Sequence, residues 1–276
     1  MLKIDLHLHS SFSDGALAPD ELVRRLKERG VSVASLTDHD TAAGVDAFLS
    51  ACRGASIRGV VGVEVAASNR SVLHILGYRF DMKNAPLADA LKSCREERVM
   101  RNLLICERLR SMGFSVTTEE AAERAGSEVV GRPHIAMIMW EKGYVPNVKA
   151  AFDLYLKKGA PAYFPRRLPT AEEWIGLIRG AGGLPVMAHP IQTTPNLEAD
   201  LPDVLTRLKD AGLWGLECWF ARASATDVLC CLSLAERFGL YPTAGSDFHG
   251  GAHHVSSPGV AVSDGLLPWA ALCGGL

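Results

Sequence analysis

Two histidines stand two residues apart near the start of the chain, where residues 2–15 read LKIDLHLHSSFSDG. Leucine or isoleucine occupies every second position from 2 to 8, and this period of two predicts a β-strand. The strand places Asp5, His7 and His9 on one face, and two imidazoles on one rigid face can bind the same metal ion. A His-x-His pair alone fits the wet face of an edge strand equally well, so the rest of the chain has to decide.

Further imidazoles and carboxylates stand at the ends of other apolar segments. They are found in TDHD at 37–40, at Glu64, at His74, in RPH at 132–134, in AHP at 188–190 and in GSDFH at 245–249. Carboxylates and imidazoles without thiolates suit manganese, iron, zinc or magnesium better than a structural zinc site. Because a carboxylate can bridge two ions, Glu64 is the expected bridge.

The elements that must position these residues alternate between strand and helix on both sides of a helical middle. Strands are predicted at 31–36, 58–66, 72–78, 184–188, 214–218, 241–244 and 260–262. Helices are predicted from Pro19 to Gly30 and over 42–52, 170–178, 201–209 and 223–238. Such alternation predicts parallel strands with the chemistry at their carboxyl ends.

The middle of the chain, residues 83–167, is predicted to be a helical insert that contributes to the substrate site, with residues 1–82 and 168–276 forming the barrel around it. Val99, Leu103, Cys106 and Leu109 recur at helical spacing and predict a buried stripe. The insert holds 15 Lys and Arg against 10 Asp and Glu, whereas the remainder holds 14 against 21. We therefore expect the insert to face an anionic substrate.

Composition narrows the class of protein. A net charge of -2 over 276 residues gives no chain-wide basic footprint for duplex nucleic acid. The seven cysteines contain no C-x-x-C pair and fit small buried hydrophobes in a reducing compartment. Neither a signal peptide nor a membrane-spanning apolar run is evident, so we expect a cytoplasmic protein with no membrane association and no obligate protein partner.

The order HxH, D, TDHD, E, H, PH, AHP, GSDFH resembles the polymerase and histidinol phosphatase (PHP) family from residue 1 to about residue 249. This resemblance implies an α/β fold, a distorted (β/α)7-type barrel with an inserted all-helical subdomain over one side of its carboxyl mouth. The stretch GRPHIAMIMWEKGYVPNVKAAFDLYLKKGAPAY at 131–163 is similar to the branch that cleaves nucleoside 3',5'-bisphosphates and RNA or DNA 5' ends, ribonuclease AM.

The resemblance also implies a set of two or three divalent ions, manganese first, with iron, zinc or magnesium as alternatives. The first ion would take His7, His9, Glu64 and Asp247, the second Glu64, His74 and His134, and the third Asp14, His39 and His249. Some members carry a histidine at the position of Asp14, and an acid is a competent replacement there.

Other site residues are assigned in the same way. Glu64 and Asp247 would be catalytic through the ions, and His189 would act as general acid or phosphate ligand. Arg132 would grip a second phosphate, with Ser10, Arg166 and Arg167 as further substrate contacts. Asp38 and Asp40 are expected to orient imidazoles, Glu217 is left open, and His253 and His254 are expected on a surface loop. Relatives often continue AHP with Gly-Arg, whereas Ile191 and Gln192 follow here.

The leading hypothesis is a metal-dependent phosphoesterase that removes the 3'-phosphate of nucleoside 3',5'-bisphosphates, for example converting adenosine 3',5'-bisphosphate to AMP. A second activity, 5'-to-3' trimming of short 5'-phosphorylated RNA or DNA, would use the same two phosphates. The alternatives are a histidinol phosphate phosphatase and a non-catalytic, metal-stabilised PHP module.

Overall fold

The computed structural model describes residues 2–68, 73–125, 129–194, 196–220, 223–250, 256–263, 265 and 267–273. In this part of the chain, eight strands form one sheet in the order β7-β6-β5-β4-β3-β2-β1-β8. The strands are β1 Leu2–Leu8, β2 Val33–Leu36, β3 Arg58–Ala66, β4 His74–Tyr78, β5 Leu184–Met187, β6 Gly215–Trp219, β7 Tyr241–Ala244 and β8 Val260–Val262.

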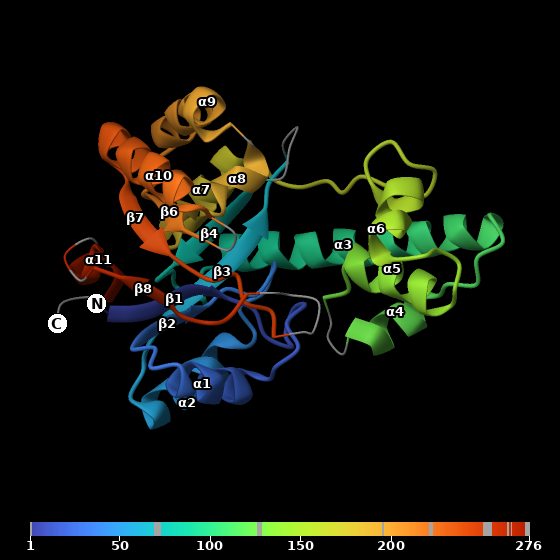
Figure 1. Ribbon diagram of the computed structural model, residues 1–276, viewed down its shortest axis with the longest axis horizontal. Coiled ribbons are helices and arrows are strands. Elements are labelled where there is room, and N and C mark those ends of the chain that lie inside the picture. Colours follow the sequence, from blue (N-terminus) through green and yellow to red (C-terminus); the bar gives the residue numbers. More distant parts are fainter. Residues whose placement is uncertain are drawn as a thin grey trace.

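The sheet curls into a nearly closed barrel (Figure 1). Strands β1, β2 and β3 pair in parallel, as do β5, β6 and β7. Leu8 at the end of β1 forms a parallel bridge with Phe248, which follows β7, and the His9 N–H donates to the Phe248 carbonyl at 3.0 Å. Strand β8 lies antiparallel against the start of β1. The predicted fold class, a distorted α/β barrel with an inserted helical segment, is confirmed.

Strand β4 runs against its neighbours, because the connection from β3, residues 67–73, is too short for the crossover that parallel strands need. Ala66 at the end of β3 pairs with His74 at the start of β4. The first residue of β4 therefore lies at the same mouth as the last residues of the parallel strands, which is how His74 comes close to Glu64.

Helices cover the outside of the barrel in two groups. Helices α1 (Pro19–Glu28) and α2 (Val45–Ala55) lie on one side, and α7 (Ala171–Gly180), α9 (Leu197–Asp210) and α10 (Ala225–Phe238) lie on the other (Figure 1). Short helices α8 (Pro190–Thr193) and α11 (Trp269–Cys273) follow β5 and β8. The stripe expected on α1, with Leu22, Val23 and Leu26, is buried as predicted.

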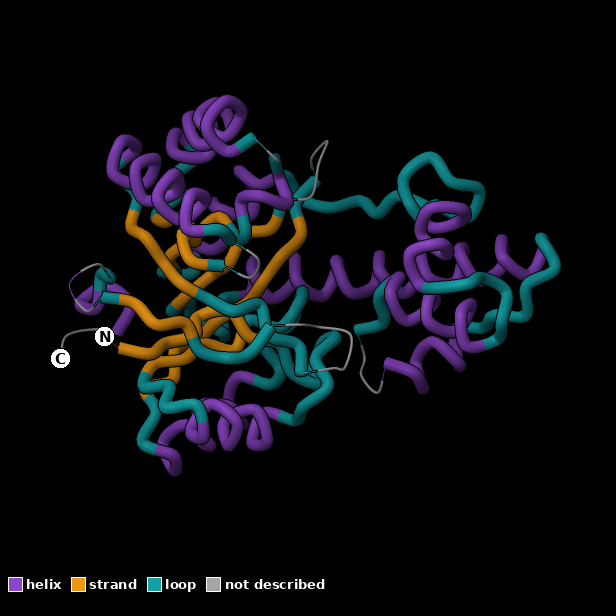
Figure 2. Tube along the Cα trace, in the orientation of Figure 1, coloured by secondary structure: helices purple, strands orange, loops and turns teal. Residues whose placement is uncertain are grey.

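The insert extends to one side of the mouth (Figures 1 and 2). It contains α3 (Ala85–Ser111), α4 (Thr118–Ala125), α5 (Arg132–Glu141), α6 (Val148–Ala151) and the π-helix η1 (Phe152–Leu156). Among the described residues no helix is both long and apolar enough to cross a membrane.

Two hydrophobic clusters share helix α3. Its first half contributes Leu87, Leu91 and Cys94 to the barrel cluster, and its second half contributes Ile105 and Leu109 to a cluster within the insert. We propose on this basis that residues 83–167 form a helical subdomain anchored on α3.

The stripe expected on α3 is partly wrong. Cys106 and Leu109 are buried, but Val99 is 61% and Leu103 36% exposed. The buried face at the middle of the helix carries Arg98, Arg101 and Asn102 instead. Leucine and valine spacing alone did not reveal this, because the inward positions between the two clusters are polar.

Leu109→Ala is expected to destabilise the protein by about 2–5 kcal/mol, because it leaves a cavity in the insert cluster. Val99→Ala on the same helix should change the free energy of unfolding by less than about 0.5 kcal/mol, because that side chain is exposed. Urea unfolding of both variants measures the difference. Equal losses would mean that the two faces of α3 are assigned wrongly.

Candidate metal centre and active site

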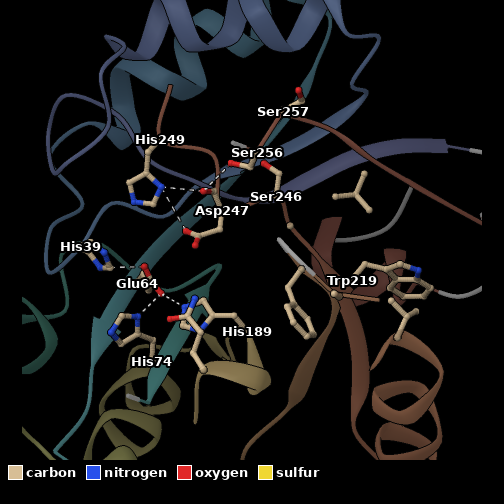
Figure 3. A pocket seen from close by; sticks show the side chains of 16 residues that line it. His39, Glu64, His74, His189, Trp219, Ser246, Asp247, His249, Ser256 and Ser257 are labelled. Carbon is tan, nitrogen blue, oxygen red and sulfur yellow. Dashed lines mark hydrogen bonds and ion pairs between the residues drawn. The ribbon is translucent and has the colours of Figure 1, made fainter. Parts of the chain in front are cut away.

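The histidines and acids singled out from the sequence gather at one end of the barrel, which we call its mouth (Figure 3). The residues come from β1 and the turn after it, from the turns after β2, β5 and β7, and from β3, β4 and β6, and they are His7, His9, Asp14, His39, Glu64, His74, His189, Glu217, Asp247 and His249.

Glu64 lies at the centre of this mouth and is fully buried. Its Oε2 atom lies 3.3 Å from the Nε2 atoms of His7 and His9 and 3.0 Å from Nδ1 of His39. Its Oε1 atom lies 2.7 Å from Nδ1 of His74 and 2.9 Å from Nε2 of His189. One carboxylate thus holds five imidazoles around itself.

The described residues contain three groups of possible metal ligands. Within each group, the ligand atoms all lie within 4.8 Å of one another. The groups are His7, His9, Glu64 and Asp247; His39, Glu64 and His74; and His9, Asp14, His39 and His249. The first group is the set expected for the first ion, and the third contains the set expected for the third ion. In the second group His39 stands where His134 was expected. We propose that these three groups hold the divalent ions, and we call them the metal groups.

The donor atoms fit metal ions because several of them are buried without a hydrogen-bond partner. Among the described residues these include Nε2 of His7, both ring nitrogens of His9, Nδ1 of His39 and Oε2 of Glu64. Buried polar atoms are normally satisfied, and a divalent ion would satisfy several of these together. Bound ions would supply an activated water and neutralise phosphate charge.

Contacts with atoms other than the proposed ligand atoms orient two of the imidazoles. Nδ1 of His7 lies 3.0 Å from Oε1 of Glu217, and Nδ1 of His249 lies 2.9 Å from the Asp247 carbonyl oxygen. Each contact points the Nε2 atom of that ring toward a ligand group, as outer partners of metal-bound histidines do.

Clustered carboxylates change the protonation of the histidines. Burial disfavours the charged form of His9, but contacts with Asp247, Glu64 and Asp14 outweigh burial and raise the pKa of His9 to about 10. Burial likewise opposes the charge on Glu64, yet the histidines around it hold the pKa of Glu64 well below its usual range. The site therefore attracts cations, whether protons or metal ions.

Glu217, which the sequence left open, uses both oxygens at the mouth. Oε1 contacts His7, and Oε2 accepts the His189 N–H at 2.7 Å. The side chain is fully buried. The sequence did contain one hint that Glu217 belongs to the site, because it is an acidic residue inside an otherwise apolar predicted strand. A buried charge of this kind needs a partner.

Asp5 holds the loop that carries Asp247. Its carboxylate accepts the N–H and the hydroxyl of Ser246, at 2.8 and 2.6 Å, and the Gly259 N–H at 2.7 Å. Burial raises the pKa of Asp5 to about 6 despite these bonds. The third polar residue on the face of β1 therefore positions a proposed ligand rather than contacting an ion.

Asp38 and Asp40 do not orient imidazoles, contrary to the sequence expectation. Asp38 accepts the N–H and the hydroxyl of Ser10, both at 2.7 Å, and the Ser13 hydroxyl. Asp40 adopts a left-handed φ of 56° that turns it toward the insert, where it pairs with Arg98 and Arg166. The substrate role predicted for Ser10 stays a prediction, but its buried hydroxyl already binds Asp38.

Two further turns at the mouth place non-glycine residues in the left-handed region, His189 at φ 25° and Asp247 at φ 51°. Such conformations cost energy and occur where side chains must be aimed. The Glu217 and Asp5 bonds described above hold both turns in place.

The remaining predicted residues lie farther from the three groups. Nδ1 of His134 accepts the Gly131 N–H at 3.0 Å, and His134 belongs to none of the groups found in the described part of the chain, so its ligand role stays a prediction. Nη1 of Arg132 donates to the Leu156 carbonyl at 3.1 Å. Arg167 is exposed on the barrel side of the insert. His253 and His254 lie outside the described residues.

A cavity of about 690 Å³ opens over the metal groups (Figure 3). One side is formed by the histidines and acids described above. The other side reaches past Gln192 to the end of β6, at Trp219 and Phe220. This volume is typical of a small-molecule site.

Glu64→Gln is expected to lower the metal content more than Asp247→Asn, because Glu64 belongs to two of the three groups and Asp247 to one. Metal-to-protein ratios of the purified variants measure this, with Glu119→Gln on the exposed surface as a matched control. Full metal content in Glu64→Gln would contradict the assignment.

Metal binding is expected to release protons. The pKa of His9 near 10 lies above its ordinary value of about 6.5, so the metal-free protein holds a proton on His9 near neutral pH. That proton must leave when a metal ion binds, and affinity should fall as the pH is lowered. Calorimetric titration in two buffers of different ionisation enthalpy measures the release, and a buffer-independent heat would argue against it.

Comparison with known proteins agrees with this geometry. The PHP domain model matches residues 5–160. A 3',5'-nucleoside bisphosphate phosphatase from Chromobacterium violaceum is 35% identical over 90% of this chain and 88% of its own. A 5'-3' exoribonuclease from Haemophilus influenzae is 33% identical over 90% of each chain.

Solved structures show the same fold. An amidohydrolase from Chromobacterium violaceum, with bound sulfate and no metal, superposes with a TM-score of 0.86 at 31% identity over 96% of this chain and 94% of its own. A predicted metal-dependent phosphoesterase from Bifidobacterium adolescentis superposes with a TM-score of 0.86 at 29% identity over 99% and 96%. The family model and these relatives, with the buried histidine and carboxylate groups, lead to one conclusion: the chain belongs to the PHP family and is a metal-dependent phosphoesterase, a hydrolase.

Proposed function

We propose that this enzyme hydrolyses the 3'-phosphate of nucleoside 3',5'-bisphosphates, such as adenosine 3',5'-bisphosphate, to give the nucleoside 5'-monophosphate. The observation that carries the proposal is a second cationic site beside the metal groups, formed by Arg98, Arg101 and Arg166, which we call the arginine cluster. A substrate with two phosphates needs two such sites. The similar bisphosphate phosphatase from Chromobacterium violaceum supports this choice.

The arginine cluster lies where α3 passes from the barrel to the insert. Arg98 and Arg101 are 9% and 7% exposed. Asp40 pairs with Arg98 and with Arg166, the latter at 3.2 Å. Arg101 has no ion pair within 4.0 Å among the described residues, and its guanidinium donates to Oδ1 of Asn102 at 2.8 Å. Two of the three cations thus share one carboxylate, and Arg101 pairs with no acid in the described part of the chain.

The excess positive charge is costly without an anion. Burial, together with the charges of Arg166, Arg98 and Arg132, lowers the pKa of Arg101 to about 8. Nε of Arg98 is buried without a hydrogen-bond partner among the described residues. A phosphate would satisfy both deficits, because its oxygens match the planar fork of a guanidinium.

The two sites are neighbours through Asp40. This residue follows His39 directly, and its N–H donates to the Glu64 carbonyl at 2.9 Å. One ribose separates the phosphates of a 3',5'-bisphosphate, so neighbouring sites are what this substrate requires. The arginine cluster would hold the 5'-phosphate while the 3'-phosphate lies over the metal groups.

His189 is the proposed proton donor or phosphate contact. Its Nε2 atom is held by Glu64, and its Nδ1 atom is buried without a partner in the described part of the chain. The ring lines the cavity and is only 3% exposed. This position supports the proposal that His189 contacts the 3'-phosphate or gives a proton to the departing 3'-oxygen.

Histidinol phosphate fits this site less well. That substrate carries one phosphate and an ammonium group, and the arginine cluster would repel the ammonium. A short 5'-phosphorylated oligonucleotide fits as well as the bisphosphate, because its first nucleotide also carries phosphates at both positions. The similar 5'-3' exoribonuclease from Haemophilus influenzae favours this second activity.

Arg101→Ala is expected to lower kcat/KM for adenosine 3',5'-bisphosphate roughly tenfold to a hundredfold, the value of one charge-assisted contact. Hydrolysis of p-nitrophenyl phosphate should change little, since it has no second phosphate. Arg110→Ala, on the exposed face of the same helix, is the matched control. An equal loss for both substrates would show that Arg101 serves the fold or the metal groups.

Arg132→Ala is expected to have a smaller effect on the same ratio. Its guanidinium is already held by the Leu156 carbonyl and lies 6.0 and 5.7 Å from the ring centroids of Phe152 and Tyr163. If Arg132→Ala discriminates against the bisphosphate more strongly than Arg101→Ala, the second phosphate binds farther into the insert than proposed.

A further inference from the structure

The cavity continues beyond the metal groups into a part that we call the downstream arm, lined by Gln192, Trp219, Phe220, Ala223, Val228 and Ser257. None of these residues carries a charge, in contrast to the arginine cluster. The arm therefore offers no cationic side chain to a second phosphate, but it offers two aromatic rings and aliphatic side chains to a flat, neutral group.

The downstream arm and the arginine cluster lie on opposite sides of the mouth. Asp40, which binds the cluster, follows β2, whereas Trp219 ends β6, and β3, β4 and β5 separate these strands in the sheet. Figure 3 shows His39 and Trp219 on either side of Glu64 and Asp247. A chain bound across the mouth would pass from the cluster over the metal groups into the arm.

A bulge in β6 lets the strand supply residues both to the metal groups and to the downstream arm. The pairing of β6 with β7 shifts between Glu217 and Trp219. Glu217 faces the metal groups, while both Trp219 and Phe220 line the arm. Bulges next to active sites commonly re-aim side chains in this way.

We propose that the downstream arm binds the nucleobase of the second nucleotide of a 5'-phosphorylated oligonucleotide. This inference rests on the proposed function, since the 5'-phosphate of the first nucleotide occupies the arginine cluster. The base of the second nucleotide stacks on the Trp219 and Phe220 side of the cavity, and the phosphodiester between the nucleotides lies over the metal groups.

The reaction is the same for both substrates. The oxygen of water bonds to phosphorus, the bond from phosphorus to the 3'-oxygen breaks, and the 3'-oxygen receives a proton. A bisphosphate yields a nucleoside 5'-monophosphate and inorganic phosphate. An oligonucleotide yields a nucleoside 5'-monophosphate and a chain one residue shorter, whose new 5'-phosphate makes it a substrate again.

The test compares three substrates that differ only beyond the phosphate being attacked. They are adenosine 3',5'-bisphosphate, 5'-phosphoadenosine 3'-(methyl phosphate) and the dinucleotide pApA. Trp219→Ala is expected to lower kcat/KM for pApA about tenfold, within the range of one base stacked on an aromatic ring. The other two substrates should change less than about twofold, and Trp219→Phe should restore most of the loss with pApA.

A second variant tests the same inference without removing a packed aromatic ring, whose loss could destabilise the fold. Val228→Trp fills the arm from α10 without removing a packed ring, and it should likewise disfavour pApA against the two substrates that lack a second base. Trp140→Ala in the insert is the control. Melting temperature and metal content, measured on every variant, identify losses that arise elsewhere.

Two results would overturn the inference: an unchanged rate with pApA in both arm variants, or an equal loss with all three substrates. A further comparison, pApA against ApA with a free 5'-hydroxyl, tests the proposed function separately. If both dinucleotides react equally well, the 5'-phosphate site is wrong, whereas the Trp219 effect on pApA can still stand.

Discussion

The structure depends on one buried carboxylate, Glu64, whose two oxygens contact five imidazoles. A carboxylate without access to water is strongly unfavourable unless cations surround it. The imidazoles can meet that need only by holding protons or metal ions. This one requirement explains why histidines on or directly after β1, β2, β4 and β5 converge on β3, and why the reversed strand β4 lies between β3 and β5.

Other buried acids fix the framework around this centre. Asp5, Asp38 and Glu217 are almost completely buried, and each uses both carboxylate oxygens for contacts that join one strand end to another. Asp5 joins β1 to the turn that carries Asp247, and Glu217 joins β6 to β1 and to the turn after β5. Positions at the mouth are therefore set by charge-assisted bonds rather than by apolar packing, which lets polar side chains stand close together without collapsing onto one another.

The sequence predicted the barrel elements well because local signals agreed there. The alternation in β1, the Pro19 start of α1 and the span of β3 all follow from periodicity and turn chemistry. The gathering of these histidines and acids at one end of the barrel could be anticipated because they stand at the ends of predicted strands, whereas their division into three ligand sets came from the family resemblance. Glu217 was left undecided because a single acid in a strand does not reveal its partner, and Asp40 was misjudged because its partners lie far away in sequence, on α3 and at Arg166.

Helix α3 shows why Arg98 and Arg101, two of the three members of the arginine cluster, could not be identified from the sequence. Its buried face runs through Leu87, Leu91 and Cys94, then through Arg98 and Arg101, and returns to Ile105 and Leu109. If the helix packed against a single hydrophobic core, an interruption of its apolar stripe would predict that this turn of the helix is exposed to solvent. Here the interruption falls between two cores, where the buried Arg98 pairs with Asp40 in the turn after β2. A break in hydrophobic periodicity inside a long helix is therefore best explained by asking what else the helix passes, and in this protein it passes Asp40, which directly follows His39.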